Sequence, residues 1–369
     1  MKNILFIHSS SEMYGSDRSL LNIVKYIDKS EFKVHVILPC DGPLVDEMKK
    51  ISEVTVEIFE VAVLRRKNLS VKGGLEYLKQ YTASLSYLKK YIRKNNIDIV
   101  DTNTAVVFPG AVAAKKCGIK SVWHIREIIR SKLENRVISF VMNRYADIIV
   151  ANSKSTGAAL MVNQDKVRVI YNAVEETAGD SNKECTAMNV GMAGRINRWK
   201  GQKLFVDAAE IVHTQMPDIK FKIAGDVYKG EEYIKEDLIC YIREKHLEDV
   251  VSLLGQVNDM SSFYNDIDLF VLPSIQPEPF GLVVIEAMEY GIPVIATNHG
   301  GPVEIIDNGI DGYLVDYRSA EEMASRIIEL MSDRDKLKDM GCSGRTKKRS
   351  MFAVGNMVKN VEKVFHEVK

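Results

Sequence analysis

Two glutamates within one short stretch have the spacing of a site for a ligand that carries several hydroxyl groups. Glu278 follows a buried apolar run that ends at Pro273-Ser274, and Glu286 lies within the predicted helix that comes next. The Phe280-Gly281 turn between them puts free backbone N–H groups at the helix start, where the helix dipole also favours an anion. A diphosphate fits such a helix start, and each carboxylate can accept hydrogen bonds from vicinal hydroxyls. The stretch therefore predicts a nucleotide-sugar site.

A second stretch supplies positive charge. Residues 191–195 read Gly-Met-Ala-Gly-Arg and close a predicted strand with Arg195, and Lys200 follows after Trp199. Arginine offers a planar fork that binds phosphate oxygens bidentately, and lysine supplies a point charge. Either cation alone is typical of an ordinary surface, but both are expected at the strand ends that also carry Glu278. Together they predict a diphosphate-binding pair of cations.

These two stretches resemble the donor-site motifs of the family 4 glycosyltransferases, which are retaining enzymes of GT-B fold. The resemblance implies that Glu278 contacts hydroxyls of the donor sugar and that Glu286 holds the ribose hydroxyls of the nucleotide. It also implies that Arg195 and Lys200 grip the donor diphosphate and stabilise the charge that develops on it. The remaining residues that the resemblance assigns to the donor are Phe280, Gly281 and Leu282 of the motif, and Gln256 and Val257 of the loop that holds the base.

The first half of the chain carries weaker matches to the same family. The family usually shows two adjacent glycines after the first strand, where this chain has Tyr14-Gly15, so only Gly15 is expected to approach a phosphate. His124 ends a predicted strand, and a histidine at the matching place in the family faces the donor sugar and the reacting centre. A lone histidine is otherwise more often structural. Arg126 and Glu127 either position the acceptor or pair with each other, and the sequence leaves both alternatives open.

Strand and helix patterns alternate along the whole chain, which favours parallel sheets with helices on both faces. The pattern runs through two series and so predicts two doubly wound, Rossmann-like α/β domains with ligands at the carboxyl ends of the strands. The family resemblance implies that the two domains face each other across a cleft, as in the GT-B fold. The expected strands are residues 3–8, 32–38, 54–60, 97–100, 121–124, 146–150 and 167–170, then 189–193, 219–224, 250–253, 269–272, 293–296 and 312–315.

The domain boundary is expected in the polar segment 175–189. Residues 1–174 would then form an acceptor-side domain and residues 175–351 a donor domain. The resemblance implies that a last helix, over about residues 352–369, crosses back onto the first domain. Residues 170–174 are similar to the stretch that closes the first domain in the family, so Asn172 is interpreted as a hinge residue.

Composition is typical of a folded globular protein and excludes several other classes. The 369 residues include 46% hydrophobic and 27% charged residues with a formal net charge of +0, so global charge indicates no partner. Five scattered cysteines predict a reducing cytoplasm, and no apolar run approaches the roughly 20 residues of a membrane helix. The Asp-x-Asp pairs at 266–268 and 333–335 are interpreted as turn and surface residues. No metal and no cofactor besides the donor is expected, since Arg195 and Lys200 can neutralise the diphosphate.

One segment departs from this neutrality. Residues 61–97 hold nine basic residues and one acidic residue, interleaved with tyrosines and leucines. Such a basic amphipathic face suits an anionic membrane surface or a lipid-diphosphate acceptor, and the alternative is a solvated helix. No nucleic-acid motif accompanies the charge, so nucleic acid is not an expected partner. The basic residues proposed for membrane contact are Arg65, Arg66, Lys67, Lys89, Lys90, Arg93 and Lys94.

The resulting hypothesis is a retaining, metal-independent glycosyltransferase of the cytoplasm and of the inner face of the cell membrane. It would move a sugar from a nucleotide-diphosphate sugar, with UDP expected from family frequency alone, to a hydroxyl of a glycan or polyprenyl-diphosphate-linked glycan in bacterial surface polysaccharide synthesis. Two other classes stay open. A nucleotide-sugar epimerase of the same fold would turn over the donor without an acceptor, and a non-catalytic nucleotide-sugar binding protein would tolerate loss of His124.

Overall fold

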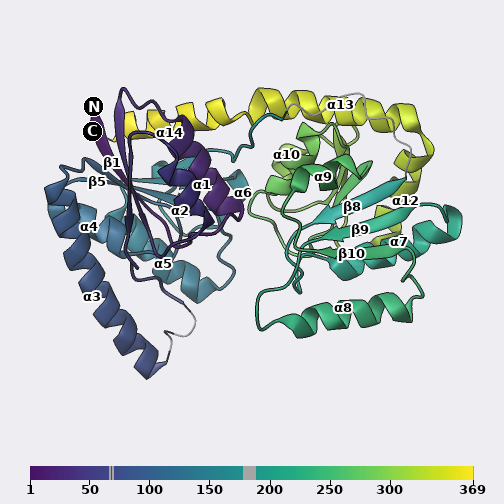
Figure 1. Cartoon of the computed structure of the whole chain (residues 1–369), viewed down its shortest axis with the longest axis horizontal. Coiled ribbons are helices and arrows are strands. Elements are labelled where there is room, and N and C mark those ends of the chain that lie inside the picture. The colour runs from purple at the N-terminus through teal and green to yellow at the C-terminus, as the bar shows by residue number, and fades with distance from the viewer. Residues whose placement is uncertain (66–67, 69, 178–187, 369) are drawn as a thin grey trace. The chain divides into compact units, whose positions relative to one another are not determined.

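The chain folds into two units in a computed structural model that describes residues 1–65, 68, 70–177 and 188–368. Unit 1 comprises residues 1–174 together with 354–369, and unit 2 comprises residues 175–353. Each unit is built on one parallel sheet with helices on both of its faces (Figure 1). The last helix belongs to unit 1, although the whole of unit 2 separates it from residue 174 in the sequence.

The sheet of unit 1 has seven strands in the order β3-β2-β1-β4-β5-β6-β7. The strands are β1 (Lys2–Ile7), β2 (Phe32–Leu38), β3 (Val54–Ile58), β4 (Ile99–Thr102), β5 (Lys120–Ile125), β6 (Ile148–Ala151) and β7 (Val167–Val169). The helices are α1 (Gly15–Tyr26), α2 (Pro43–Lys49), α3 (Val71–Lys94), α4 (Pro109–Cys117), α5 (Lys132–Tyr145), α6 (Lys154–Ala159), the short 3₁₀ helix η2 (Gln164–Lys166) and α14 (Val354–Glu367).

Alternating side chains of β1 show how this sheet is covered. Ile4 and Phe6 are buried among residues of α1, α2 and α14, whereas Leu5 and Ile7 face residues of α3 and α4. Phe365 of α14 lies edge-on to Phe6, with ring centres 5.9 Å apart. Helix α14 is therefore a built-in part of the core of unit 1 and is not a loose tail.

The sheet of unit 2 has six strands in the order β10-β9-β8-β11-β12-β13. The strands are β8 (Asn189–Ala193), β9 (Lys220–Ala224), β10 (Val251–Gly255), β11 (Leu269–Leu272), β12 (Val294–Thr297) and β13 (Gly312–Val315). The helices are α7 (Gln202–Gln215), α8 (Glu232–Glu244), α9 (Met260–Asn265), α10 (Leu282–Glu289), α11 (Pro302–Ile305), α12 (Ala320–Ser332) and α13 (Arg334–Met351).

All thirteen strands lie within two residues of the expected positions, and the prediction of two doubly wound parallel sheets is confirmed. In each sheet the chain order reverses beside the first strand of the unit, between β1 and β4 and between β8 and β11. Loops leaving two such neighbouring strands diverge to opposite faces of the sheet and leave a crevice at the carboxyl edge, where ligands bind in folds of this kind. Each unit therefore has one place where a site is expected.

Candidate functional site

The carboxyl edge of β8 and β11 in unit 2 brings a lysine and a glutamate into direct contact. Lys200 Nζ lies 2.5 Å from Glu278 Oε1, although the two residues are far apart in the sequence. The hydroxyl of Ser274 donates to the same carboxylate oxygen at 2.6 Å. Glu278 is 5% exposed, so this ion pair is largely withdrawn from water. A withdrawn pair of opposite charges at the chain reversal can exchange its partners for the phosphate and hydroxyls of one ligand.

Two glycines permit the close approach that forms this pair. Gly201 has a φ of 79°, and a side-chain carbon there would lie 1.8 Å from the carbonyl oxygen of Pro273. Gly300 has a φ of 72°, and a side-chain carbon there would lie 2.3 Å from the carbonyl oxygen of Glu278. Any other residue at either place is both strained and in collision with backbone. The glycines therefore set how near the loop of Lys200 comes to the loop of Glu278.

Glu286 lies on the second turn of α10 and is half-buried. Its Oε2 accepts a hydrogen bond of 2.8 Å from the hydroxyl of Tyr264, a residue that is itself buried. Because the tyrosine fixes the carboxylate, Glu286 is held ready to accept further hydrogen bonds without reorganising.

The turn between the two glutamates has a structural role that the sequence did not predict. Phe280 is 2% exposed, and its ring lies edge-on to that of Phe352 in the interior of unit 2. Its side chain is therefore part of the core. Gly281 has a φ of 94° and caps the start of α10, where Leu282 is the first helical residue. A ligand at this turn would meet backbone N–H groups and not the phenylalanine ring.

Arg195 follows β8 and is held flat. Its guanidinium carbon lies 3.4 Å from the centre of the Tyr228 ring, and the Gln202 side chain donates to its carbonyl oxygen at 3.0 Å. Stacking on an aromatic ring fixes the plane of a guanidinium and keeps its charge. Gln256 and Val257 follow β10, two strands from β8 and so roughly 10 Å across the sheet. Arg195, Gln256 and Val257 thus follow strands of the same sheet edge, and their roles toward a diphosphate and a base stay predictions.

In unit 1, the two residues expected at the site differ in position: Gly15 begins a helix and His124 is buried inside the unit. Gly15 is the first residue of α1, at the end of the loop that follows β1. His124 is 1% exposed, and its Nδ1 lies 3.6 Å from Oδ1 of the equally buried Asp101. Burial lowers the pKa of His124 well below its usual value and raises the pKa of Asp101 to about 8. Both groups are therefore neutral near pH 7, and the expected contact of His124 with a donor sugar stays a prediction.

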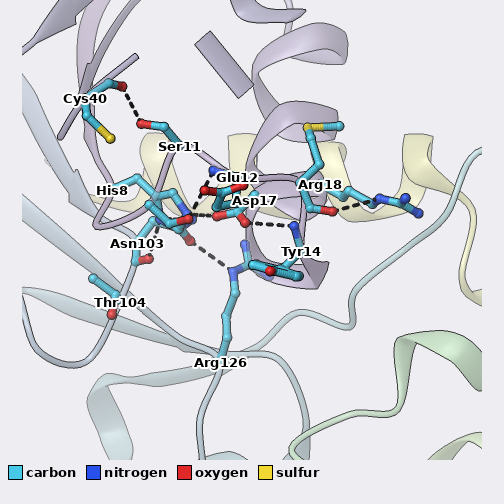
Figure 2. Close-up of polar contacts among 12 residues, drawn as sticks. His8, Ser11, Glu12, Tyr14, Asp17, Arg18, Cys40, Asn103, Thr104 and Arg126 are labelled. Carbon is cyan, nitrogen blue, oxygen red and sulfur yellow. Dashed lines mark hydrogen bonds and ion pairs between the residues drawn. The ribbon is translucent and has the colours of Figure 1, made fainter. Parts of the chain in front are cut away.

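The carboxyl edge of β1, β4 and β5 holds a network of polar side chains instead. His8 Nε2 lies 2.5 Å from Asp17 Oδ1, and the other carboxylate oxygen of Asp17 accepts from the Tyr14 backbone N–H at 2.8 Å. His8 Nδ1 is 3.0 Å from the carbonyl oxygen of Asn103, and Asn103 Oδ1 accepts from Arg126 Nε at 3.0 Å. Figure 2 shows His8, Asn103 and Arg126, from the loops after β1, β4 and β5, meeting Asp17 at the start of α1.

Sequence reasoning missed His8, Asp17 and Asn103. A signal was present, because His8 and Asn103 each come directly after a buried strand run. Neighbouring parallel strands end at the same edge of a sheet, so polar residues at those places meet. Without knowledge that β1 and β4 are neighbours, nothing in the sequence pairs them. Glu127 does not pair with the guanidinium of Arg126, since its oxygens accept from the Thr104 hydroxyl at 3.2 Å and from the Arg126 backbone N–H at 3.1 Å.

Two family models match the chain, one in each half. The model described as Glycosyltransferase Family 4 matches residues 13–177, and the model described as Glycosyl transferases group 1 matches residues 175–347. The chain belongs to the family 4, or group 1, glycosyltransferases.

Two curated relatives match this family 4 glycosyltransferase over most of its length. The UDP-Gal:alpha-D-GlcNAc-diphosphoundecaprenol alpha-1,3-galactosyltransferase of Escherichia coli is 26% identical over 384 residues, covering 95% of this chain and 92% of that protein. The N-acetyl-alpha-D-glucosaminyl L-malate synthase of Bacillus anthracis is 25% identical over 314 residues, covering 78% of this chain and 79% of that protein.

Solved structures place the family 4 glycosyltransferase in the GT-B fold. HepE of Anabaena in complex with UDP and glucose has a TM-score of 0.84 at 25% identity, covering 99% of this chain and 100% of that one. A glycosyltransferase of Rickettsia africae has a TM-score of 0.82 at 22% identity, covering 100% of this chain and 98% of that one. These likenesses confirm the predicted fold class, two Rossmann-like domains in one chain. The roles of individual residues stay predictions.

Proposed function

We propose that this protein transfers a sugar, with retention of the anomeric configuration, from a UDP-sugar to a hydroxyl of a glycan or lipid-linked glycan. The observation that carries the proposal is the Lys200–Glu278 pair at the chain reversal of unit 2, where Arg195 follows β8 and Glu286 lies on α10, the helix after β11. UDP is supported by HepE, which was solved with UDP and with UDP-glucose. The lipid-linked acceptor is supported by the name of the Escherichia coli relative.

The geometry suggests how the residues share the work. A UDP-sugar offers phosphate oxygens to Lys200 and Arg195 and sugar hydroxyls to Glu278, so it replaces both halves of the existing ion pair at once. In the proposed reaction the bond between the anomeric carbon and the diphosphate breaks, and the acceptor oxygen bonds to that carbon on the same face. The acceptor proton passes to the departing diphosphate. Fixed cations beside that leaving group stabilise the charge as it develops, where such groups have their largest effect.

We further propose that the reaction needs no metal ion. Lys200 and Arg195 carry the positive charge that a divalent ion would otherwise bring to the diphosphate. The test is binding of UDP with and without EDTA, followed by NMR of the glycoside product. EDTA-insensitive binding and an unchanged anomeric configuration are expected. Loss of binding in EDTA would refute metal independence, and an inverted product would refute retention.

The donor assay also separates the competing classes. An epimerase would convert a UDP-sugar with no acceptor present, and a binding protein would bind UDP without any turnover. Transfer that depends on an added acceptor hydroxyl supports the proposed function. Conversion without an acceptor would replace it by isomerisation.

Two helices of unit 1 support docking on an anionic membrane surface. Exposed apolar side chains repeat along one face of α3, at Val71, Leu75 and Leu78, and along one face of α5. Tyr81 of α3 packs into the same apolar cluster as residues of α5. The α5 residues are Leu133, Val137 and Phe140, which are 73%, 48% and 70% exposed.

Basic side chains precede α3 and occupy its carboxyl-terminal turns, farther along the same helix than its apolar face. Arg65, Lys90, Arg93 and Lys94 are exposed and Lys89 is half-buried, whereas Arg66 and Lys67 lie outside the described residues. Each Lys or Arg near an anionic surface contributes about 1 kcal/mol. No helix among the described residues is long and apolar enough to cross a membrane. We therefore propose peripheral attachment at the inner face of the cell membrane.

Sedimentation with liposomes tests this attachment. The full chain should pellet with vesicles of phosphatidylglycerol, less so at high salt, and not with neutral vesicles. Phe140→Ser combined with Leu133→Ser should weaken pelleting, while Tyr233→Ser on the exposed face of α8 in unit 2 serves as the control. Equal pelleting of all variants, or none by the wild type at low salt, would refute the surface.

A further inference from the structure

Arg126 in unit 1 is held by neutral partners. Its Nε donates to Asn103 Oδ1 at 3.0 Å, and its Nη1 donates to the side-chain oxygen of Asn172. No carboxylate forms an ion pair with this guanidinium among the residues that the structure describes. Amide oxygens fix the direction of a guanidinium but do not cancel its charge. The arrangement therefore presents a preorganised positive charge, since the side chain is already ordered before any ligand arrives.

Three acids, Asp17, Asp101 and Glu127, attract the charge of Arg126 without an ion pair to it among the described residues. Asp17 is engaged by His8 at 2.5 Å, and Glu127 by the hydroxyl of Thr104 at 3.2 Å. Burial raises the pKa of Asp101 to about 8, so that group is mostly uncharged near neutral pH. Burial also lowers the pKa of Arg126, to about 10, although these acids oppose the shift. Arg126 is half-buried, so water screens its charge only in part, which strengthens its attraction for an anion.

Arg126 lies at the carboxyl edge of the sheet beside the reversal of strand order, where folds of this kind bind ligands. It follows β5 and meets residues that follow β1 and β4, the two strands between which the chain order reverses. Through Asn103 and His8 it is tied to Asp17, which fixes the loop before α1 (Figure 2). Its Nη2 has no hydrogen-bond partner in the part of the chain that the structure describes. Nη2 and the second N–H of Nη1 form a fork of the kind that binds two oxygens of one phosphoryl group.

We propose that Arg126 is a phosphoryl-binding residue of unit 1, held in place by Asn103 and Asn172. The choice of a phosphoryl group as the anion rests on the proposed function, because both a nucleotide-sugar donor and a lipid-diphosphate acceptor carry one. The inference assigns to Arg126 a binding role toward substrate and leaves His124, two residues earlier, in the buried interior.

Calorimetric titration of the full chain with UDP, and of the UDP-saturated chain with inorganic pyrophosphate, tests the proposal and identifies the source. If the phosphoryl group belongs to the donor, Arg126→Gln should weaken UDP binding by roughly 10- to 100-fold, as for loss of a hydrogen bond to a charged group. If it belongs to an acceptor, UDP binding stays unchanged and pyrophosphate binding to the UDP-saturated chain falls by that factor. Lys116→Gln removes one exposed charge from the same unit and should change neither affinity.

A second variant keeps the fold of the site and removes only its net charge. Asn172→Asp retains the acceptor oxygen for Arg126 but neutralises the guanidinium, so it should mimic Arg126→Gln. Arg126→Lys keeps a positive charge but loses the fork of two N–H groups, so its affinity should lie between those of wild type and Arg126→Gln. Affinities for both ligands within twofold of wild type in folded Arg126→Gln and Asn172→Asp would overturn the proposal. If wild type fails to bind UDP, the proposed function fails, whereas Arg126-dependent pyrophosphate binding would still support the inference.

Discussion

The carboxyl edges of the two sheets hold a cation in two different ways. In unit 2, Lys200 is paired with the carboxylate of Glu278 at 2.5 Å, and the pair is nearly neutral as a whole. In unit 1, Arg126 is held by the amides of Asn103 and Asn172 and keeps its charge. In unit 2 a ligand must separate Lys200 from Glu278 and bind both side chains. In unit 1 an anion can bind Arg126 without breaking an ion pair. The comparison suggests that the first site discriminates between ligands, since only a molecule with phosphate and hydroxyls satisfies both groups, and that the second attracts phosphoryl groups of any kind.

The largest expected effect follows from removing a cation at the proposed donor site of unit 2. Arg195→Ala should lower kcat by roughly 10²–10³-fold, as for loss of one contact to charge that develops in the transition state. Arg198→Ala removes an exposed arginine three residues later and is the matched control. Steady-state kinetics with a UDP-sugar and an acceptor measures the ratio. An unchanged kcat in Arg195→Ala would remove this residue from the mechanism.

The ion pair itself should appear in the stability of the protein. Lys200→Met leaves the largely buried carboxylate of Glu278 without its cation and should lower the free energy of unfolding by about 3 kcal/mol. Adding Glu278→Gln removes the unpaired charge and should restore most of that loss. Urea unfolding of both single variants and the double variant measures the coupling. Additive losses would mean that Lys200 and Glu278 do not depend on each other.

A smaller effect concerns the uncharged state of Asp101. Its pKa is about 8 in the folded protein against an ordinary 3.8, so between these values the folded chain holds a proton that the unfolded chain has lost. Wild-type stability therefore falls as the pH rises through this window. Asp101→Asn has no such proton. Its free energy of unfolding should therefore rise relative to that of wild type from pH 6.5 to pH 8, and the difference should then level off. His124 is neutral in the folded protein because burial lowers its pKa, and its titration in the unfolded chain is common to wild type and Asp101→Asn, so it cancels in their difference.

Thermal unfolding across pH 6.5–9 measures this difference. Asp41→Asn, at an exposed aspartate in the same unit, should run parallel to wild type at every pH. A constant gap between Asp101→Asn and wild type would show that Asp101 is ionised in the folded protein and that Arg126 has a carboxylate for its counter-ion.

The smallest expected effect sharpens the description of Arg126. Glu127→Gln should change UDP and pyrophosphate affinities by no more than about twofold, because this exposed carboxylate meets the Thr104 hydroxyl and not the guanidinium. Calorimetry on the variant provides the numbers. A larger gain in pyrophosphate affinity would identify Glu127 as the counter-ion of Arg126. Both sheet edges would then hold their cation by a carboxylate.

The sequence groups the candidate residues of unit 2 more completely than those of unit 1, for a physical reason. Glu278 and Glu286 belong to one continuous strand–turn–helix stretch, and Arg195 and Lys200 to another, so local pattern and family resemblance sufficed to group them. The network of His8, Asn103 and Arg126 comes from three loops that only the strand order brings together. Local pattern also does not show that the Phe280 ring packs against Phe352, because whether a side chain beside a turn faces a ligand or the core depends on the residues that pack behind it.

The most direct test of the donor site is the affinity of UDP for the wild type and for Glu286→Ala, measured by calorimetry in the presence of EDTA. Glu236→Ala, at an exposed glutamate of α8, controls for loss of one negative charge from unit 2. We predict that wild type and Glu236→Ala bind UDP alike, and that Glu286→Ala binds it roughly 10- to 100-fold more weakly. Equal affinity in all three proteins would contradict the assignment of the nucleotide to the edge of β8 and β11.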